Sequence, residues 1–418
     1  MAALTSAIGR VAPLTGPADA SLSAFFRSQK DMGVRDRAFV AEGVFAYLRR
    51  KRSVEALAGT ADPRYLALAV TVREGTGSVR DLQPWINVSE AEWLAAFKGR
   101  MRDPLPEPVA ADVPDWLWER LGEVYGADER AALTRSWQVA APFDLRVNPL
   151  SAKRDEALAA LQADGLDVAP TPYAPLGIRV RGRPSLTRHP WLADGRLEVQ
   201  DEGSQLIAHL VAPRRSDMVV DFCAGAGGKT LLLGALMRSQ GRLYAFDVAE
   251  RRLERLTPRL ARSGLSNVHP QRLLHERDPK VKRLAGKIDR VLVDAPCTGF
   301  GTLRRNPDLK WRQTPQDLAE LTAKQARILD AAAGLLKPGG RLVYATCSVL
   351  PEENDAIVDA FLAAHPEFGA LDATAELARQ GVTLDTGARL RLLPHRHGCD
   401  GFFAAVLERS AHAGAIAP

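Results

Sequence analysis

Two cysteines each follow an apolar run of strand length. The run 288–293 continues into Asp294-Ala295-Pro296-Cys297, and the run 341–345 continues into Thr346-Cys347-Ser348. Parallel strands end at one edge of their sheet, so neighbouring strands would bring both thiols together there. A lone buried cysteine is usually inert filler. Two thiols at strand ends, one of them beside an acid, instead indicate nucleophilic chemistry, because nearby cations or a helix N-terminus would favour the thiolate.

A glycine-rich stretch follows another apolar run, 218–222. It reads Cys223-Ala224-Gly225-Ala226-Gly227-Gly228-Lys229. Small residues let a backbone approach a ligand closely, and the helix that follows offers free N–H groups. A phosphate-binding Walker loop is disfavoured, because Cys223 stands where that motif requires glycine. The next strand ends at Asp247, whose carboxylate could accept from two ribose hydroxyls. The pattern favours a nucleoside cofactor; the alternative is that the glycines only pack a helix against a sheet.

The elements that would position these residues alternate between strand and helix. Strand-length runs at 218–222, 243–246, 290–293 and 341–345 are separated by helical segments at 229–238, 249–263 and 317–336. This alternation predicts an α/β fold over residues 201–410, with a doubly wound, Rossmann-like parallel sheet. In such a sheet the ligands bind beyond the carboxyl ends of the strands.

Two further parts are predicted upstream. Residues 1–140 show helical periodicity, as in 36–50, and predict an all-α bundle. Residues 141–200 contain a strand at 143–147, a helix at 152–164 and a strand at 178–181, which predict a small α/β segment. The proline-rich stretch 103–108 is interpreted as a linker.

The composition excludes several classes of protein. A chain of 418 residues with 46% hydrophobic and 25% charged residues is globular and long enough for two to four domains. Four cysteines without a CxxC pair indicate a reducing compartment and no zinc ribbon. The donors in 395–400 (HRHGCD) crowd one short turn, so no metal site is expected. Without an 18-residue apolar run or a signal-peptide pattern, the sequence predicts a cytoplasmic protein that does not bind a membrane.

The net charge of +6 is unevenly distributed. Residues 1–140 carry 18 basic and 18 acidic side chains, whereas residues 251–312 carry 16 basic and 6 acidic ones. An arginine-rich chain permits a nucleic-acid partner, although on the totals alone codon bias in a GC-rich genome is the better explanation. Arginines in 251–262 could form a solvated helix face. Arg304 and Arg305, which follow the Cys297 motif, are predicted to contact nucleic-acid phosphates.

Several motifs resemble one enzyme family. DFCAGAGGKT, DAPCTG and LVYATCSVLPEEN look like motifs of the RNA cytosine-5 methyltransferases of the Sun/Fmu (RsmB) ribosomal-RNA type. FDLRVNPL, LEVQDEGSQL, RRNPDLKW and DGFFAAVL match that family in order and spacing, so the resemblance covers about residues 140–410. DRAFVAEGVFAYLRR is similar to the NusB-like helical domain of the bacterial members.

The resemblance implies a chemistry for the two thiols. Carbon 5 of cytosine is a poor nucleophile until a thiolate adds to carbon 6 and creates an enamine. By family resemblance Cys347 is that nucleophile and Cys297 assists product release. The residues alone leave these roles open, because in DNA cytosine-5 methyltransferases the cysteine of a PC motif attacks. Asp294 would hold the cytosine edge, or else cap the next turn. Lys229 would orient the substrate or Asp294, or else be a loop charge.

The resemblance also implies S-adenosylmethionine as the cofactor. Its binding residues would be Cys223, Ala224, Gly225, Ala226, Gly227, Gly228, Lys229, Asp247, Asp294 and an acid after the third strand. For that acid we take Asp278, with Glu276 as a competing candidate, since His275–Pro279 (HERDP) departs from the family's usual Gly-Asp turn. The family commonly has Ala-Pro where this chain has Gly225-Ala226, but the residues remain small.

The implied function is methylation of carbon 5 of a cytosine in RNA. The substrate expected is 16S ribosomal RNA, because of the NusB-like segment. The alternatives are a transfer-RNA cytosine-5 methyltransferase and a non-catalytic NusB-like RNA-binding factor. The predicted parts are a NusB-like RNA-binding domain (1–140), a small α/β RNA-binding subdomain (141–200) and a catalytic domain (201–410), in a monomer without a bound metal.

Overall fold

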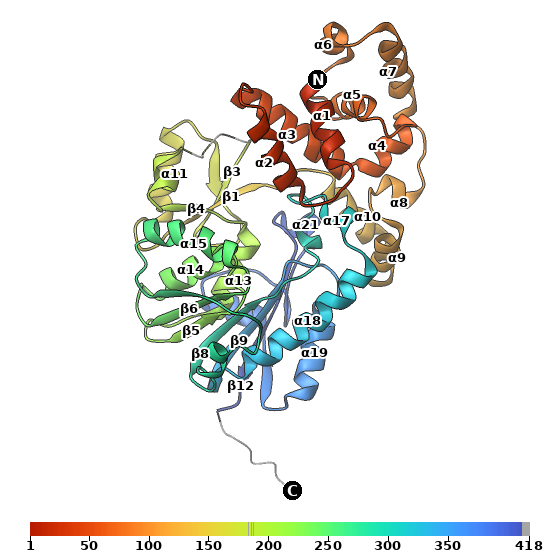
Figure 1. Ribbon diagram of the computed structural model, residues 1–418. Helices are drawn as coiled ribbons and strands as arrows, with labels where there is room; N and C mark the ends of the chain where they lie inside the picture. Colours follow the sequence, from red (N-terminus) through yellow and green to blue (C-terminus); the bar gives the residue numbers. More distant parts are fainter. Residues whose placement is uncertain (183, 185, 187, 412–418) are drawn as a thin grey trace. The chain divides into compact units, whose positions relative to one another are not determined.

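The computed structural model describes residues 1–182, 184, 186 and 188–411 (Figure 1). The chain divides into two compact units. The helical unit comprises residues 1–140 and 302–315, and the catalytic unit comprises residues 141–301 and 316–418. The sequence boundary at 140 coincides with this division, but the return of 302–315 to the helical unit was not predicted.

The main sheet of the catalytic unit has the strand order β10-β12-β9-β8-β5-β6-β7, with β11 paired to β12 (Figure 1). Strands β5 to β9 pair in parallel, whereas β10, β11 and β12 are antiparallel to their partners. The strands are β5 (Met218–Asp221), β6 (Arg242–Asp247), β7 (Val268–Arg272), β8 (Ile288–Asp294), β9 (Leu336–Thr346), β10 (Phe368–Leu371), β11 (Leu390–Leu392) and β12 (Phe402–Arg409).

Helices cover both faces of this sheet. One apolar cluster joins the sheet to α13 (Glu202–Val211), α14 (Gly228–Leu236), α15 (Glu250–Ser263) and α20 (Ala373–Arg379). A second cluster joins it to α16 (Pro279–Lys282), α18 (Pro315–Ala333) and α19 (Asp355–Ala364). Strand β5 lies between β6 and β8, and the order of the strands along the chain reverses at this point. Open α/β sheets bind their ligands at such a switch point. The predicted doubly wound, Rossmann-like fold is confirmed.

A second, antiparallel sheet precedes the main one in the same unit. Its order is β2-β3-β1-β4. The strands are β1 (Phe143–Val147), β2 (Val168–Pro170), β3 (Gly177–Val180) and β4 (Leu197–Val199), and the helices are α11 (Arg154–Ala163) and α12 (Pro190–Ala193). Leu145, Val147 and Ile178 are buried against α11, which gives this small sheet an apolar core of its own.

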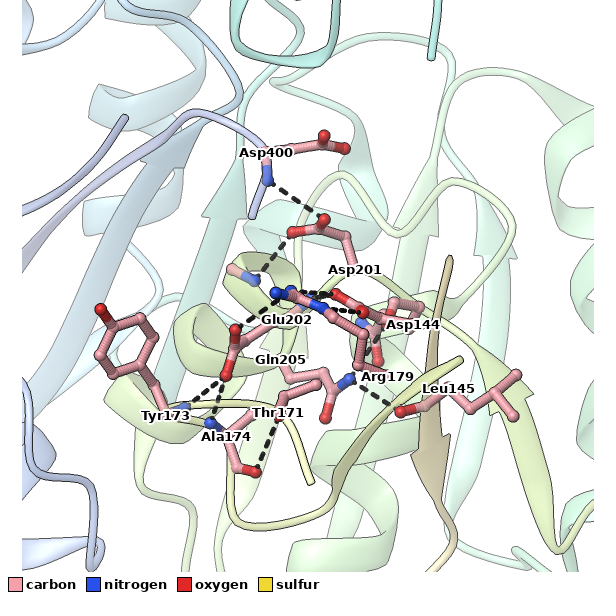
Figure 2. Close-up of polar contacts among 12 residues, drawn as sticks. Asp144, Leu145, Thr171, Tyr173, Ala174, Arg179, Asp201, Glu202, Gln205 and Asp400 are labelled. Carbon is pink, nitrogen blue, oxygen red and sulfur yellow. Dashed lines mark hydrogen bonds and ion pairs between the residues drawn. The ribbon is translucent and has the colours of Figure 1, made fainter. Parts of the chain in front are cut away.

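Buried charges fasten the small sheet to α13 (Figure 2). Arg179 of β3 donates to both carboxylate oxygens of Asp144 on β1, at 2.8 and 2.9 Å. Glu202, in the first turn of α13, lies 3.5 Å from Arg179 and accepts from two backbone N–H groups before β3. Asp201 accepts from the backbone N–H of Asp400 at 3.1 Å. The small sheet is therefore part of the catalytic unit and not a separate domain.

The helical unit is built from the N-terminal helices and one returning segment. In 302–315, Trp311 donates to the Leu48 carbonyl at 2.7 Å and Lys310 to the Arg49 carbonyl at 2.9 Å. The helices are α1 (Ala2–Val11), α2 (Ala18–Ser28), α3 (Val34–Arg49), α4 (Lys51–Ala58), α5 (Pro63–Arg73), α6 (Val79–Leu82), α7 (Val88–Arg100), α8 (Glu107–Ala110), α9 (Asp115–Val124), α10 (Ala127–Trp137) and α17 (Leu309–Arg312).

The proline-rich stretch lies inside this unit, so its interpretation as a linker between domains is wrong. Helix α8 begins within it, and Asp112 just beyond it is fully buried. Asp112 accepts from the backbone N–H and the hydroxyl of Ser53, at 2.8 and 2.7 Å. These bonds hold the stretch against α4.

Candidate active site

A cavity of about 580 Å³ lies at the carboxyl edge of the main sheet. It receives residues from the turns after β5, β6, β7, β8 and β9, as the predicted topology requires. Its walls include Asp221, Cys223, Ala224, Gly225, Ala226, Gly228, Lys229, Asp247, Arg252, Glu276, Asp294, Cys297, Lys324 and Cys347. The predicted glycine loop, strand-end acids and both cysteines thus share one site.

The glycine loop has a tight, left-handed backbone. Gly225 and Gly227 have φ values of 55° and 84°, a region that glycine enters without strain. A Cβ on Gly227 would lie 2.1 Å from Leu256 of α15, so this glycine also permits close packing and does not line the cavity. Asp247 accepts from the backbone N–H groups of Gly225 and Ala249, at 2.9 and 2.7 Å. Asp247 therefore fixes the loop while it faces the cavity.

The two thiols are in contact. The Sγ atoms of Cys297 and Cys347 are 3.3 Å apart, although fifty positions separate them in the chain. The hydrogen bond with Cys347, and then burial, raise the pKa of the Cys297 thiol well above its ordinary value. Cys297 is thus held as a thiol beside Cys347. The arrangement can supply one nucleophile and one proton-bearing partner.

Lys229 and Asp294 form an ion pair in the same cavity. The Lys229 ammonium lies 2.7 Å from one oxygen of Asp294. Burial alone would lower the pKa of Lys229, but the Asp294 carboxylate outweighs it and the pKa is raised. Lys229 is therefore a charged group that holds Asp294 in position. The alternative interpretation, in which Lys229 is a loop charge without a partner, is wrong. Within the described residues, the Asp294 carboxylate accepts from Lys229 and not from the backbone of the next turn, so its second oxygen is available to a ligand.

Asp221 is a cavity residue that the sequence analysis missed. It ends β5, is 1% exposed, and accepts from the Thr230 hydroxyl at 2.7 Å through one oxygen. The other oxygen is buried and has no hydrogen-bond partner among the described residues. Burial raises the pKa of Asp221 to about 7, against the Thr230 hydrogen bond that lowers it. Its place at a strand end, like that of Asp247 and Asp294, was the signal that could have found it.

Of the two acids proposed after the third strand, the structure places Glu276 in the cavity wall and Asp278 outside it. Asp278 is the N-cap of α16 and accepts from the backbone N–H groups of Lys280 and Leu274, at 2.8 and 2.9 Å. Aspartate before proline is a favoured helix start, and this local role directs the Asp278 carboxylate into its own turn.

The burial of Arg304 does not favour its predicted contact with RNA phosphates. Arg304 is 6% exposed, within the helical unit, and its carbonyl accepts from the guanidinium of Arg49 at 3.1 and 3.2 Å. A side chain buried in this way is poorly placed to meet a phosphate. Arg305 is only partly buried, and its contact with RNA stays a prediction.

The cavity fits a nucleoside cofactor. Its volume is within the usual range for small-molecule sites, and its walls combine a close-approach loop with carboxylates from several strand ends. The unsatisfied oxygen of Asp221 adds an acceptor for a donor or a cationic group. Within the described residues, no group of three His, Cys, Asp or Glu side chains suits a metal ion, and no helix is long and apolar enough to cross a membrane.

The fold and the cavity define a Rossmann-like α/β protein with a nucleoside-cofactor site at the carboxyl edge of its sheet. Residues 208–408 match the family described as 16S rRNA methyltransferase RsmB/F, and residues 113–187 match an RsmF/B-like ferredoxin-like domain. The chain belongs to the RsmB/F family and is an RNA methyltransferase. The resemblance noted from the motifs is confirmed. The ferredoxin-like match begins just before α9 and includes α9 and α10, which the structure places in the helical unit.

Curated relatives agree with this assignment. The probable ribosomal RNA small subunit methyltransferase B of Synechocystis is 38% identical over 302 residues, which cover 71% of this chain and 67% of the relative. The ribosomal RNA small subunit methyltransferase B of Salmonella arizonae is 36% identical over 350 residues, covering 82% and 78%.

Two solved structures resemble the chain. The crystal structure of PH0851 matches with a TM-score of 0.77 and 27% identity, covering 97% of this chain and 98% of its own. NSun6 from Pyrococcus horikoshii with SFG matches with a TM-score of 0.64 and 21% identity, covering 72% and 99%, a likeness of fold alone.

Proposed function

We propose that this methyltransferase transfers a methyl group from S-adenosylmethionine to carbon 5 of a cytosine in 16S ribosomal RNA, through a covalent cysteine–cytosine intermediate. The observation that carries the proposal is the pair of thiols, 3.3 Å apart in the wall of the cavity that holds the glycine loop. A methyltransferase acting on a more nucleophilic atom needs neither thiol. The cofactor supplies an electrophilic methyl group; the rest of the chemistry falls to the chain's own residues.

Cys347 acts as the nucleophile in this proposal. Its thiolate bonds to carbon 6 of the ring. Asp294 holds the Watson–Crick edge and stabilises the charge that develops there on addition. After carbon 5 carries the methyl group, a base takes the proton from that carbon, and the C–H electron pair re-forms the double bond between carbons 5 and 6. The bond from sulfur to carbon 6 then breaks, and the Cys347 thiolate leaves. Cys297, held as a thiol at hydrogen-bond distance, assists this release. Lys229 keeps Asp294 oriented.

The RNA substrate is proposed from the relatives' names and the domain organisation. Both curated relatives are named ribosomal RNA small subunit methyltransferase B. The helical unit and the small sheet are the proposed RNA-binding parts. The target cytosine must leave its stack to reach the thiols, because they lie in the wall of a cavity. A cytoplasmic, monomeric protein remains the expectation.

The cysteine roles are tested by trapping the intermediate. The variants Cys297→Ala and Cys347→Ala are incubated with unmodified 16S ribosomal RNA and labelled S-adenosylmethionine, and then resolved on denaturing gels. We expect Cys297→Ala to accumulate a protein–RNA adduct, since release fails, and Cys347→Ala to form neither adduct nor product. Mapping of the labelled nucleotide should give 5-methylcytosine.

Cys399→Ala is the matched control, because Cys399 is buried in the core away from the cavity wall. It should behave as the wild type in adduct formation. If Cys347→Ala instead accumulates the adduct and Cys297→Ala forms none, Cys297 is the nucleophile and Cys347 assists release. Label at any atom other than carbon 5 of cytosine would refute the proposed reaction.

A further inference from the structure

Two loop carbonyls behind the cofactor cavity are held by arginines from outside the loop. The Ala226 carbonyl accepts from Arg259 of α15 at 2.6 Å. The Gly228 carbonyl accepts from Arg146 of β1 at 2.7 Å. Both carbonyls belong to residues that line the cavity. Hydrogen bonds from a charged donor are the stronger kind, so these two bonds restrain the loop from its outer side.

The small sheet holds both arginines in place. Glu198 of β4 accepts from Arg259 through Nε and Nη2, at 3.1 and 2.8 Å, and is only 4% exposed. Gln200, the residue directly after β4, accepts from the guanidinium of Arg146. Each guanidinium therefore bridges a side chain of residues 198–200 and a carbonyl of the glycine loop.

Burial makes this arrangement costly to disturb. Arg146 is 2% exposed, and burial lowers its pKa to about 10 while Glu198 opposes that effect. A buried guanidinium must keep its acceptors, because an unpaired one is strongly unfavourable. Leu256 of α15 presses on the loop from the same side as Arg259, where it leaves room only for glycine at position 227.

We propose that the small sheet is part of the cofactor site: Arg259 and Arg146, oriented by Glu198 and Gln200, are positioning residues that fix the glycine loop for S-adenosylmethionine. This rests on the proposed cofactor and goes beyond RNA binding, the role expected of residues 141–200. It also gives a function to part of the basic helix 251–262. Arg259 is turned inward to a carbonyl and a carboxylate, not outward as a solvated face.

Arg262 provides the matched control. It lies one turn after Arg259 on α15 and bonds to the other oxygen of Glu198 at 2.8 Å. Among the described residues, its hydrogen bond and ion pair reach Glu198 of the small sheet and not the glycine loop. Arg259→Ala and Arg262→Ala therefore each remove an ion pair with Glu198, and only the first also removes a bond to the loop.

The test measures cofactor affinity by calorimetry on the full chain, with S-adenosylmethionine and with S-adenosylhomocysteine. We expect Arg259→Ala to raise the Kd of both about tenfold, the effect of one charged hydrogen bond. Arg262→Ala should stay within about twofold of the wild type. With saturating cofactor, the kcat of Arg259→Ala should recover, since the loop acts on binding and not on the thiols.

Conservative variants keep the test decisive if Arg259→Ala does not fold. Arg259→Lys keeps a donor for Ala226 but loses the two-point contact with Glu198, and should raise the Kd less than the alanine variant. Glu198→Gln should raise the Kd although it does not touch the loop. Melting temperatures show whether Arg259→Ala and Arg262→Ala lose equal stability.

Equal Kd values for Arg259→Ala and the wild type, or equal increases for Arg259→Ala and Arg262→Ala, would overturn the inference. A wild-type protein that binds neither compound would overturn the proposed cofactor itself. The two failures are therefore distinguishable.

Discussion

At the scale of single residues, the site contains groups whose pKa values are shifted by their neighbours and by burial. The pKa of Cys297 is raised by its hydrogen bond to Cys347 and by burial, and that of Lys229 is raised because Asp294 outweighs burial. Strand-end residues were predictable, because apolar runs mark where each strand ends. The acid after the third strand was not predictable in this way. Glu276 and Asp278 lie in the same turn, and only the structure shows that Asp278 is the one that caps α16.

Glu353 extends the site behind Cys297. It is fully buried and accepts from the backbone N–H and hydroxyl of Thr298, at 2.8 and 2.6 Å, and from Gln325 at 3.0 Å. Its charge is one of the causes, after Cys347 and burial, that raise the pKa of Cys297. We expect Glu353→Gln, in a Cys347→Ala background, to lower the pH midpoint for alkylation of Cys297. Mass spectrometry after pulses of iodoacetamide measures this midpoint.

The neighbouring Glu352 gives the control for charge. Glu352 is not among the groups that shift the pKa of Cys297, so Glu352→Gln should leave the alkylation profile in place. An unchanged midpoint in Glu353→Gln would show that its carboxylate does not hold Cys297 protonated.

Glu276 and Asp278 should separate binding from stability. We expect Glu276→Gln to weaken cofactor binding by roughly three- to tenfold, because it removes a carboxylate from the cavity wall. Asp278→Ala should leave that affinity unchanged and lower the melting temperature, because the α16 cap is lost. Calorimetry with S-adenosylhomocysteine and thermal unfolding measure the two effects. Weaker binding in Asp278→Ala alone would restore the acid originally predicted.

At the scale of elements, the sequence was informative where strands are buried on both faces. Strands β5, β6, β8 and β9 appear as apolar runs because helices cover both sides of them. Within the described part of the chain, strand β7 (VHPQR) pairs only with β6, and Val268 is its one buried residue, so no apolar run marked it. Strand β4 has three residues, too few for a periodic pattern, yet its Glu198 supports the cofactor loop.

The Cys297 turn depends on a close approach between two backbones. The Gly301 N–H donates to the Cys347 carbonyl at 2.8 Å, and the Gly401 N–H donates to the Gly301 carbonyl at 2.8 Å. A Cβ on Gly301 would lie 2.0 Å from the Gly401 carbonyl oxygen. We expect Gly301→Ala to lower kcat at least about tenfold, because the Cys297 turn must shift away from Cys347. Steady-state kinetics with saturating cofactor measures the loss.

Gly369 on β10 is the control for this substitution, because a Cβ there meets no atom within 4 Å. Gly369→Ala should retain kcat, and the cofactor Kd of Gly301→Ala should remain close to that of the wild type. A fully active Gly301→Ala would show that the turn tolerates the displacement.

At the scale of the whole molecule, the local surplus of positive charge has several separate uses. Within residues 251–312, Arg259 pairs with Glu198, Arg272 with Glu250 and Arg290 with Asp217. Arg304 and Lys310 are buried in the helical unit. A count along the sequence could not distinguish these roles, because pairing and burial depend on residues far away in the chain. The net charge therefore overstates how much of this stretch is available to RNA.

Lys310 should make the stability of the helical unit depend on pH. It is fully buried and donates to the Arg49 carbonyl, and burial lowers its pKa to about 7, although Asp112 opposes that effect. The unfolded chain keeps this proton up to about pH 10.4. Between these values the unfolded state binds more protons, so stability rises as the pH increases above about 7. Below about 7 this group adds no further dependence.

The substitution Lys310→Met should remove that rise and, at pH 6, increase the melting temperature by roughly 5 °C, since the variant no longer buries a charge. Urea unfolding of the full chain at pH 6 and pH 9 tests this through tryptophan fluorescence, because every tryptophan except Trp191 lies in the helical unit. Lys98 is exposed, so Lys98→Met should keep the wild-type dependence. If Lys310→Met is instead less stable than the wild type at pH 6, the charged ammonium stabilises the unit, and its bond to Arg49 outweighs the cost of burial.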